Sequence, residues 1–216
     1  MSDKGTGLIR AIFDTDNFFM QICEKILDLM TVNLLFLLSC LPLVTIGIAK
    51  LSLYQTLFEI KGNRRVKVIR TYTRIFRENW RQGLKLGLLE LALVCISLFD
   101  LLLFRTQEAL PFQVLKAVCF GMIIFTILLS LCVYPLAGKF LMSFRDVLQT
   151  SLVIVSLNFP WFVVMMAVIA AILVIISSSG FVLLLGFSLF AFIGFAGLAY
   201  LQLPILEKIF AKYSSL

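Results

Sequence analysis

Glu90 is the side chain whose type and position most directly suggest chemistry. It lies within an apolar segment, residues 83–104, where an ionised carboxylate costs about 2.5 to 3.5 kcal/mol unless it finds a partner or a proton. One interpretation is a relay for protons or cations. Another is a structural pair with Lys50 or Lys116, or a carboxyl that faces a small water pocket, and the sequence leaves these alternatives open.

Two other polar residues lie in apolar segments. Asn33 falls within residues 22–43, and an amide at that depth seeks an interhelical hydrogen bond worth about 0.6 to 2 kcal/mol. Lys50 falls within residues 44–60, where its amine must snorkel outward or pair inside a helical bundle. Asn33, Lys50 and Glu90 are therefore the predicted intramembrane polar residues.

A basic stretch, residues 61–85, holds nine of the 19 Lys and Arg residues and a single acid, Glu78. Wound as a helix, it places its cations on one stripe and its aromatic and aliphatic residues on the opposite one. The predicted apolar stripe consists of Val66, Ile69, Tyr72, Phe76 and Trp80. Such a helix suits the cytoplasmic membrane interface, where anionic lipid attracts each cation by about 1 kcal/mol; the alternative is a solvated loop that only fixes topology. The residues predicted to meet the membrane interface or a partner are Arg70, Arg74, Phe76, Arg77, Trp80 and Arg81.

The sequence lacks the residues that most catalytic and metal sites need. It contains no histidine, which excludes Ser-His-Asp and Cys-His catalysis and any haem or zinc site with a histidine ligand within this chain. Its five cysteines lie singly in apolar segments, without a CxxC pair, as buried thiols do. There is no P-loop, carboxylate cluster or nucleophile motif. We therefore expect no enzyme activity, no cofactor and no metal site.

The composition is that of a polytopic membrane protein. With 61% hydrophobic residues and 21 phenylalanines among 216 residues, a soluble domain could not cover its surface. The net charge of +7 does not indicate nucleic-acid binding, because the cations concentrate between apolar segments, as the positive-inside rule requires. Aromatic residues near the ends of the apolar segments are expected to be interfacial anchors. They are Trp80, Tyr134, Trp161 and Tyr200.

The predicted fold is all-α: a single membrane domain, 1–216, built as a polytopic transmembrane helical bundle with a cytoplasmic basic amphipathic helix. The expected divisions are an interfacial lead at 1–21, a helical hairpin at 22–60, the basic segment at 61–85, a four-helix bundle at 86–206 and a tail at 207–216. The expected crossings are 22–43, 44–60, 83–104, 111–133, 152–176 and 181–203. The positive-inside rule places the C-terminus in the cytoplasm. Six crossings place the N-terminus there too, whereas five, without 44–60, place it outside.

Several motifs carry a resemblance to a known family. The run NLLFLLSCLPLVTIGIAKLSLYQTLFEI from Asn33 and the basic run TRIFRENWRQGLKLGLL ending at Leu89 resemble the YesL family, bacterial membrane proteins with one domain of unknown function. Later runs, YPLAGKF from Tyr134 and LNFPW from Leu157, fit the same family. Lys50 departs from the pattern, because the family commonly keeps small neutral residues there.

The resemblance implies an accessory role in sugar uptake, since genes of this family in Gram-positive bacteria often stand beside those for carbohydrate ABC importers and glycan-degrading enzymes. The chain has no ATPase motif and no solute-binding domain, so any import needs partner subunits. We expect a non-catalytic accessory subunit of the bacterial cytoplasmic membrane, in contact with the lipid bilayer and with importer permease helices. The alternative is a small stand-alone transporter or channel that uses Glu90, with Lys50, in a polar path.

Overall fold

The computed structural model describes residues 18–63, 66–140 and 142–213, and within these ranges every regular element is a helix. The predicted all-α polytopic helical bundle is therefore confirmed. The predicted interfacial lead falls mostly on residues 1–17, outside the described ranges. The elements are α2 (Phe18–Cys40), η1 (Leu43–Thr45), α3 (Ile46–Gly62), α4 (Val68–Glu78), α5 (Trp80–Leu103), α6 (Leu110–Lys139), α7 (Phe144–Leu157), α8 (Phe159–Ser177), α9 (Gly180–Leu189), η2 (Phe190–Gly194) and α10 (Phe195–Tyr213).

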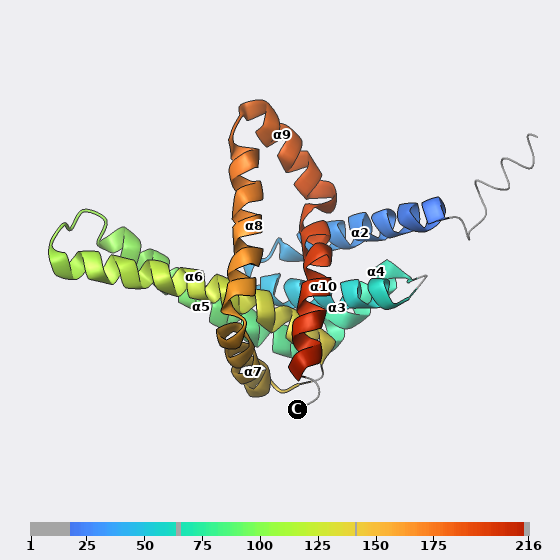
Figure 1. Ribbon diagram of the computed structural model, residues 1–216, viewed down its shortest axis with the longest axis horizontal. Helices are drawn as coiled ribbons and strands as arrows, with labels where there is room; N and C mark the ends of the chain where they lie inside the picture. The colour runs from blue at the N-terminus through green and yellow to red at the C-terminus, as the bar shows by residue number, and fades with distance from the viewer. Residues whose placement is uncertain (1–17, 64–65, 141, 214–216) are drawn as a thin grey trace, which may run out of the picture.

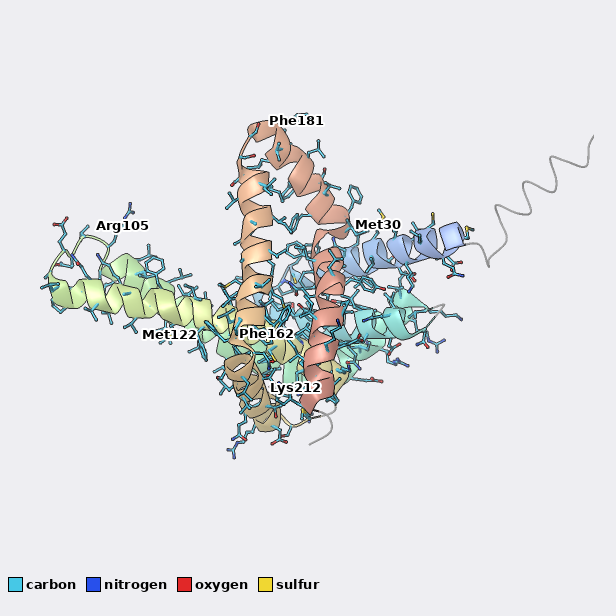
Figure 2. The ribbon with its side chains drawn as sticks, in the orientation of Figure 1. Met30, Arg105, Met122, Phe162, Phe181 and Lys212 are labelled. Atoms are coloured by element: carbon cyan, nitrogen blue, oxygen red, sulfur yellow. The ribbon has the colours of Figure 1, made fainter. Side chains whose placement is uncertain are left out.

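The helices form a hub with two arms (Figure 1). The hub is the region centred on α3, which contacts α2, α4, α5, α6 and α10. The first arm is the hairpin of α5 and α6, and the second is the hairpin of α8 with α9 and α10; the two arms diverge from the hub. The tips carry the chain reversals, marked by Arg105 on the first arm and Phe181 on the second (Figure 2).

Five helical stretches in the described part of the chain are long and apolar enough to cross a membrane, which supports a membrane protein. They are Leu43–Gly62, Trp80–Leu103, Leu110–Lys139, Phe159–Ser177 and Gly180–Tyr213. These five stretches are not the five crossings of the predicted alternative, which included 22–43 and omitted 44–60. The ambiguous segment 44–60 qualifies, whereas α2 does not, because its first half carries Glu24, Lys25 and Asp28.

Several helix boundaries differ from those predicted. α6 runs to Lys139 and α10 to Tyr213, beyond the predicted ends at 133 and 203, so most of the predicted tail 207–216 is helical. The basic stretch is helical only from Val68 to Glu78, and Asn79 separates it from α5. The span predicted at 152–176 begins instead at Phe159, because α7 is a separate helix that ends at Leu157. Pro160 lies in the first turn of α8, where a missing backbone N–H costs nothing and the fixed φ favours a helix start.

The arms leave most of their apolar side chains on the outside. In α8 the buried residues are Phe162 and Met165, and side chains project outward along both arms in Figure 2. The outer faces of α5 and α6 likewise expose apolar residues such as Phe99 and Phe120. In a bilayer such faces contact lipid tails or the helices of another protein.

α3 and α5 approach each other closely at Gly47, Gly83 and Gly87. A Cβ atom on Gly47 would lie 2.4 Å from the Gly83 carbonyl oxygen and 2.4 Å from the Gly87 Cα atom. Gly83 and Gly87 form a GxxxG motif, which lets helix backbones pack directly against each other. The approach places residues one turn further along each helix, Lys50 and Glu90, within reach of one another.

Candidate functional site

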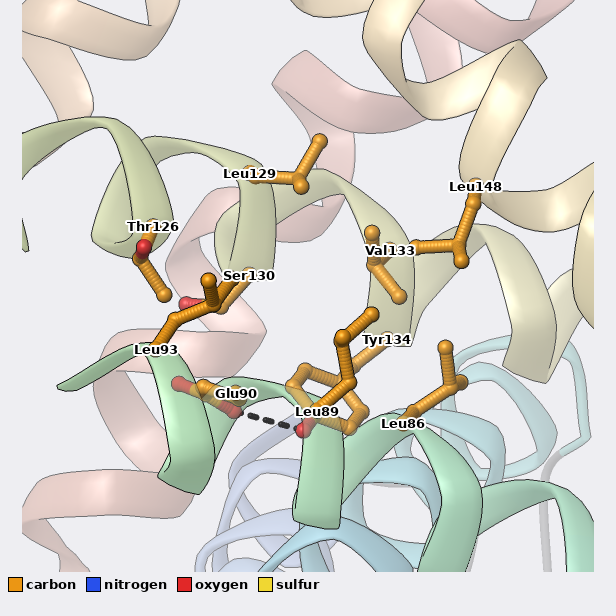
Figure 3. Close-up of a pocket in the computed structure, with 10 residues that line it drawn as sticks. All are labelled: Leu86, Leu89, Glu90, Leu93, Thr126, Leu129, Ser130, Val133, Tyr134 and Leu148. Atoms are coloured by element: carbon orange, nitrogen blue, oxygen red, sulfur yellow. Dashed lines mark hydrogen bonds between the residues drawn. The ribbon is translucent and has the colours of Figure 1, made fainter. Parts of the chain in front are cut away.

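Glu90 is the centre of a polar cluster shared by α3, α5 and α6. The Lys50 Nζ atom lies 2.7 Å from Glu90 Oε1, and the Tyr134 hydroxyl donates to Glu90 Oε2 across 2.6 Å. Figure 3 shows this second bond as a dashed line. The ammonium of Lys50 also lies 5.0 Å from the centroid of the Tyr134 ring, a cation–π distance. Both carboxylate oxygens of Glu90 therefore have a donor.

Two cavities border the cluster on different sides. The smaller, about 30 Å³, is lined by Glu90, Thr126, Ser130 and Tyr134 together with leucines and a valine (Figure 3); it has room for about two water molecules. The larger, about 270 Å³, is lined by Lys50 and reaches α8 and α10. Ser130 and Tyr134 line both cavities.

The arrangement suits a neutral structural pair. A carboxylate that keeps an ammonium and a phenol as donors avoids most of the cost of a lone charge in an apolar layer. Within the described ranges, no three His, Cys, Asp or Glu side chains come together as metal ligands would. Of the alternatives left open by the sequence, the structure pairs Glu90 with Lys50, whereas the Lys116 amine donates to the Arg105 and Gln107 carbonyls.

Asn33 lies away from this pair and binds a π-helical turn in the second arm. Its Nδ2 donates to the carbonyl oxygens of Phe190 (3.0 Å) and Ala191 (2.8 Å), and its Oδ1 accepts from the backbone N–H of Ala196 (3.0 Å). A π turn disturbs the regular hydrogen-bond ladder of a helix. The fully buried Asn33 side chain completes that ladder and ties α2 to α10.

The basic helix α4 turns its apolar face into the protein. Val68, Tyr72 and Ile75 are buried, and the hydroxyls of Tyr72 and Ser39 lie 2.5 Å apart. Burial raises the pKa of Tyr72 above its usual range. The predicted apolar stripe is thus wrong in part. Ile69 is 62% exposed, because the buried face follows positions 68, 72 and 75.

The residues predicted to meet the interface or a partner occupy two different helices. Arg70, Arg74, Phe76 and Arg77 lie on α4, whereas Trp80 and Arg81 begin α5. Phe76 is half-buried and stacks with Tyr72 at 6.3 Å between ring centroids. Arg74 pairs with Glu59 at 3.1 Å, while Arg70, Arg77, Trp80 and Arg81 are exposed.

Tyr134 and Gln202 are site residues that the sequence did not identify as such. Tyr134 was expected to be an interfacial anchor, yet it is buried and bonded to Glu90. Gln202, on α10, accepts a 3.3 Å hydrogen bond from the Tyr54 hydroxyl. A polar residue inside the predicted span 181–203 was the available signal for Gln202. The GxxxG motif at Gly83 and Gly87 was the signal for the close approach of α3 and α5.

Residues 29–101, about a third of the chain, match the family described as "Protein of unknown function, DUF624". The matched segment includes Asn33, Lys50, Glu90 and the whole of α4, whereas Tyr134 and Gln202 lie outside it. No curated protein matches the chain. No solved structure matches it either.

Proposed function

We propose that this chain is a non-catalytic integral membrane accessory subunit that packs against the permease helices of a bacterial carbohydrate ABC importer. The observation that carries the proposal is the contrast between the arms and the hub. The arms diverge and expose apolar faces, with two buried residues along the whole of α8, while the polar groups Asn33, Lys50 and Glu90 are bonded within the protein. Faces of this kind associate with other transmembrane helices by close packing.

The pairing of Glu90 favours this function over a stand-alone transporter. A proton or cation relay needs a carboxylate that can exchange its partner, yet both oxygens of Glu90 have donors. The cavity beside it holds about 30 Å³, too little for a sugar. The alternative remains a small transporter or channel that uses Glu90 and Lys50, and its support is the larger cavity beside Lys50.

The finer identity and orientation belong to the same proposal. The DUF624 match and the motif resemblance support membership of the YesL family and a place in the bacterial cytoplasmic membrane. The exposed arginines of α4 and the Lys208 and Lys212 end of α10 lie on the hub, so the positive-inside rule puts these basic ends on the cytoplasmic side of the membrane. Both arm tips then face outward, and the C-terminus lies in the cytoplasm. Because α2 is not among the helices apolar enough to span, the N-terminus lies there too when both ends of α3 are on the cytoplasmic side.

Purification from native membranes tests the proposal. The tagged chain is extracted in mild detergent from cells grown on a complex glycan, and we expect permease and ATPase subunits to co-purify in fixed ratio. Recovery of the chain without them would refute it. Three variants add bulk to exposed positions on different arm helices: Ala92→Phe, Gly121→Phe and Ala171→Phe. At least one should lower recovery of the complex without lowering the stability of the chain.

Reconstitution separates the two functions. In proteoliposomes that contain only this protein, we expect no flux of sugars, protons or alkali cations above that of empty vesicles. Flux that is lost in Glu90→Gln would instead establish the stand-alone transporter.

A further inference from the structure

The larger cavity lies between the hub and the second arm, and its walls are of two kinds. One wall is polar, with the ends of Lys50, Tyr54 and Gln202 on α3 and α10. The other is apolar, formed by α8, the π turn and the start of α10, including Leu173, Phe190 and Phe195. A volume of about 270 Å³ with apolar walls and a few convergent polar groups has the form of a small-molecule site.

Two donors point to a hydrogen-bond acceptor at the polar wall. Lys50 uses one of its three N–H donors on Glu90. The Gln202 side chain accepts from Tyr54 through its oxygen, and its nitrogen donates to no described residue. Gln202 lines the cavity, so this nitrogen is available to a ligand bound there.

The charge balance favours a neutral head group. Glu90 already matches the charge of Lys50 at 2.7 Å, so a carboxylate or phosphate in the cavity would add an uncompensated negative charge in an apolar region. An ester or hydroxyl oxygen accepts the same hydrogen bonds without that cost.

The opening of the cavity indicates where such a ligand comes from. Leu173 and Phe195 line the cavity and are also exposed, at 53% and 41%. Both lie on helical stretches apolar enough to cross a membrane, so the mouth faces the bilayer rather than water. A molecule that reaches the site from the acyl layer must carry an apolar chain.

We propose that this cavity binds a neutral single-chain amphiphile of the monoacylglycerol class, with its ester and hydroxyl oxygens at Lys50 and Gln202 and its chain against Leu173, Phe190 and Phe195. The proposal does not depend on the importer function. A site of this kind ties occupancy by lipid to the contact between the second arm and the hub.

Photolabelling of the full-length protein in nanodiscs tests the site. The probe is a monoacylglycerol whose acyl chain carries a diazirine, and the labelled residues are located by mass spectrometry. We expect adducts to concentrate on the apolar wall of the cavity and to fall with excess unlabelled monolaurin. Lauric acid, whose carboxylate adds an uncompensated charge, and dodecane, which has no hydrogen-bond acceptor, should each compete roughly tenfold less well or worse.

Variants connect the labelling to the cavity. Gln202→Leu should weaken competition by monolaurin roughly tenfold, and Ala199→Phe, which fills the wall from α10, should remove the cavity adducts. Ala171→Phe is the matched control, because Ala171 is exposed on α8, and it should leave them unchanged. Adducts spread evenly over the outer faces of the arms, or equal competition by lauric acid or dodecane, would overturn the proposal. If Ala199→Phe does not fold, the adduct map of the unaltered protein and Gln202→Leu decide the matter.

Discussion

The Lys50–Glu90 pair makes a quantitative prediction about what holds the hub to the first arm. Breaking a fully buried ion pair by removing one partner costs about 3 to 5 kcal/mol, because the other charge is left alone. The two side chains here retain 28% and 20% exposure, which screens the remaining charge and reduces the expected cost to about 2 kcal/mol. We therefore expect Lys50→Met and Glu90→Gln each to lower the free energy of unfolding by about 2 kcal/mol.

The double variant Lys50→Met/Glu90→Gln removes both charges and leaves neither unpaired. It also keeps an acceptor for the Tyr134 hydroxyl, which donates to Glu90 across 2.6 Å. We expect it to cost about 2 kcal/mol in total instead of the additive 4, a coupling energy of about 2 kcal/mol. Tyr134→Phe alone should cost about 1.5 to 3 kcal/mol, because it removes a hydrogen bond to a charged group.

The free energies are measured by SDS titration in mixed micelles, with far-UV circular dichroism as the signal. Additive effects, with a coupling energy under about 0.5 kcal/mol, would refute the reasoning that the pair acts as a unit. The same variants bear on function. An accessory subunit with Glu90→Gln should still assemble with its partners to the extent that it folds, whereas a relay would stop at once.

Three further predictions follow from packing and exposure. Gly47→Ala should lower the free energy of unfolding by about 1 to 3 kcal/mol, because the new Cβ would meet rigid backbone at 2.4 Å. Gly121→Ala, which has open space around it, should instead raise the free energy of unfolding by about 0.5 to 1 kcal/mol in the same titration. Asn33→Leu should cost about 2 kcal/mol and increase hydrogen exchange at Ala196, whose N–H loses its acceptor. Gln at both Arg70 and Arg77, which are exposed, should leave insertion and unfolding unchanged within about 0.5 kcal/mol, so any effect on recovery of the importer complex will report docking.

The membrane class and the helical fold could be predicted from the sequence because they depend on the average composition of long segments. Apolar runs long enough to cross a bilayer leave few alternatives. The helix ends were harder. The boundary at Asn158 is set by a change of direction between α7 and α8, and nothing in the local pattern of 152–176 marks it except Pro160.

The candidate site was predictable in its residue types but not in its partners. A carboxylate in an apolar segment had to find a cation, and both Lys50 and Lys116 were available. Helix periodicity cannot choose between them, because the choice depends on which helices pack. The glycine contact of Gly47 with Gly83 and Gly87 settles it by bringing α3 onto α5. Tyr134 was not identified as a site residue because an aromatic side chain near the end of a span suits an interfacial anchor equally well.

The last prediction concerns the membrane topology of α3. The contacts of α3 indicate that this helix does not cross the membrane. Gly47, at its start, packs on the first third of α5, and Gln55 accepts from Asn79, the residue before α5. Lys61, at its end, pairs with Glu207 near the end of α10. A crossing helix would instead have one end beside the tips of the arms.

Both ends of α3 therefore contact the hub ends of the arms, so we expect residues 43 and 63 to lie on the same side of the membrane although α3 is apolar enough to span it. Single cysteines at Leu43 and Asn63, both exposed, are placed in a cysteine-free background. A membrane-impermeant maleimide should label both in inverted vesicles and neither in intact cells, while a cysteine at Arg105 on the tip of the first arm shows the reverse. Labelling of Leu43 from outside would mean that α3 crosses, and the packing of Gly47 against the start of α5 would then have to be wrong.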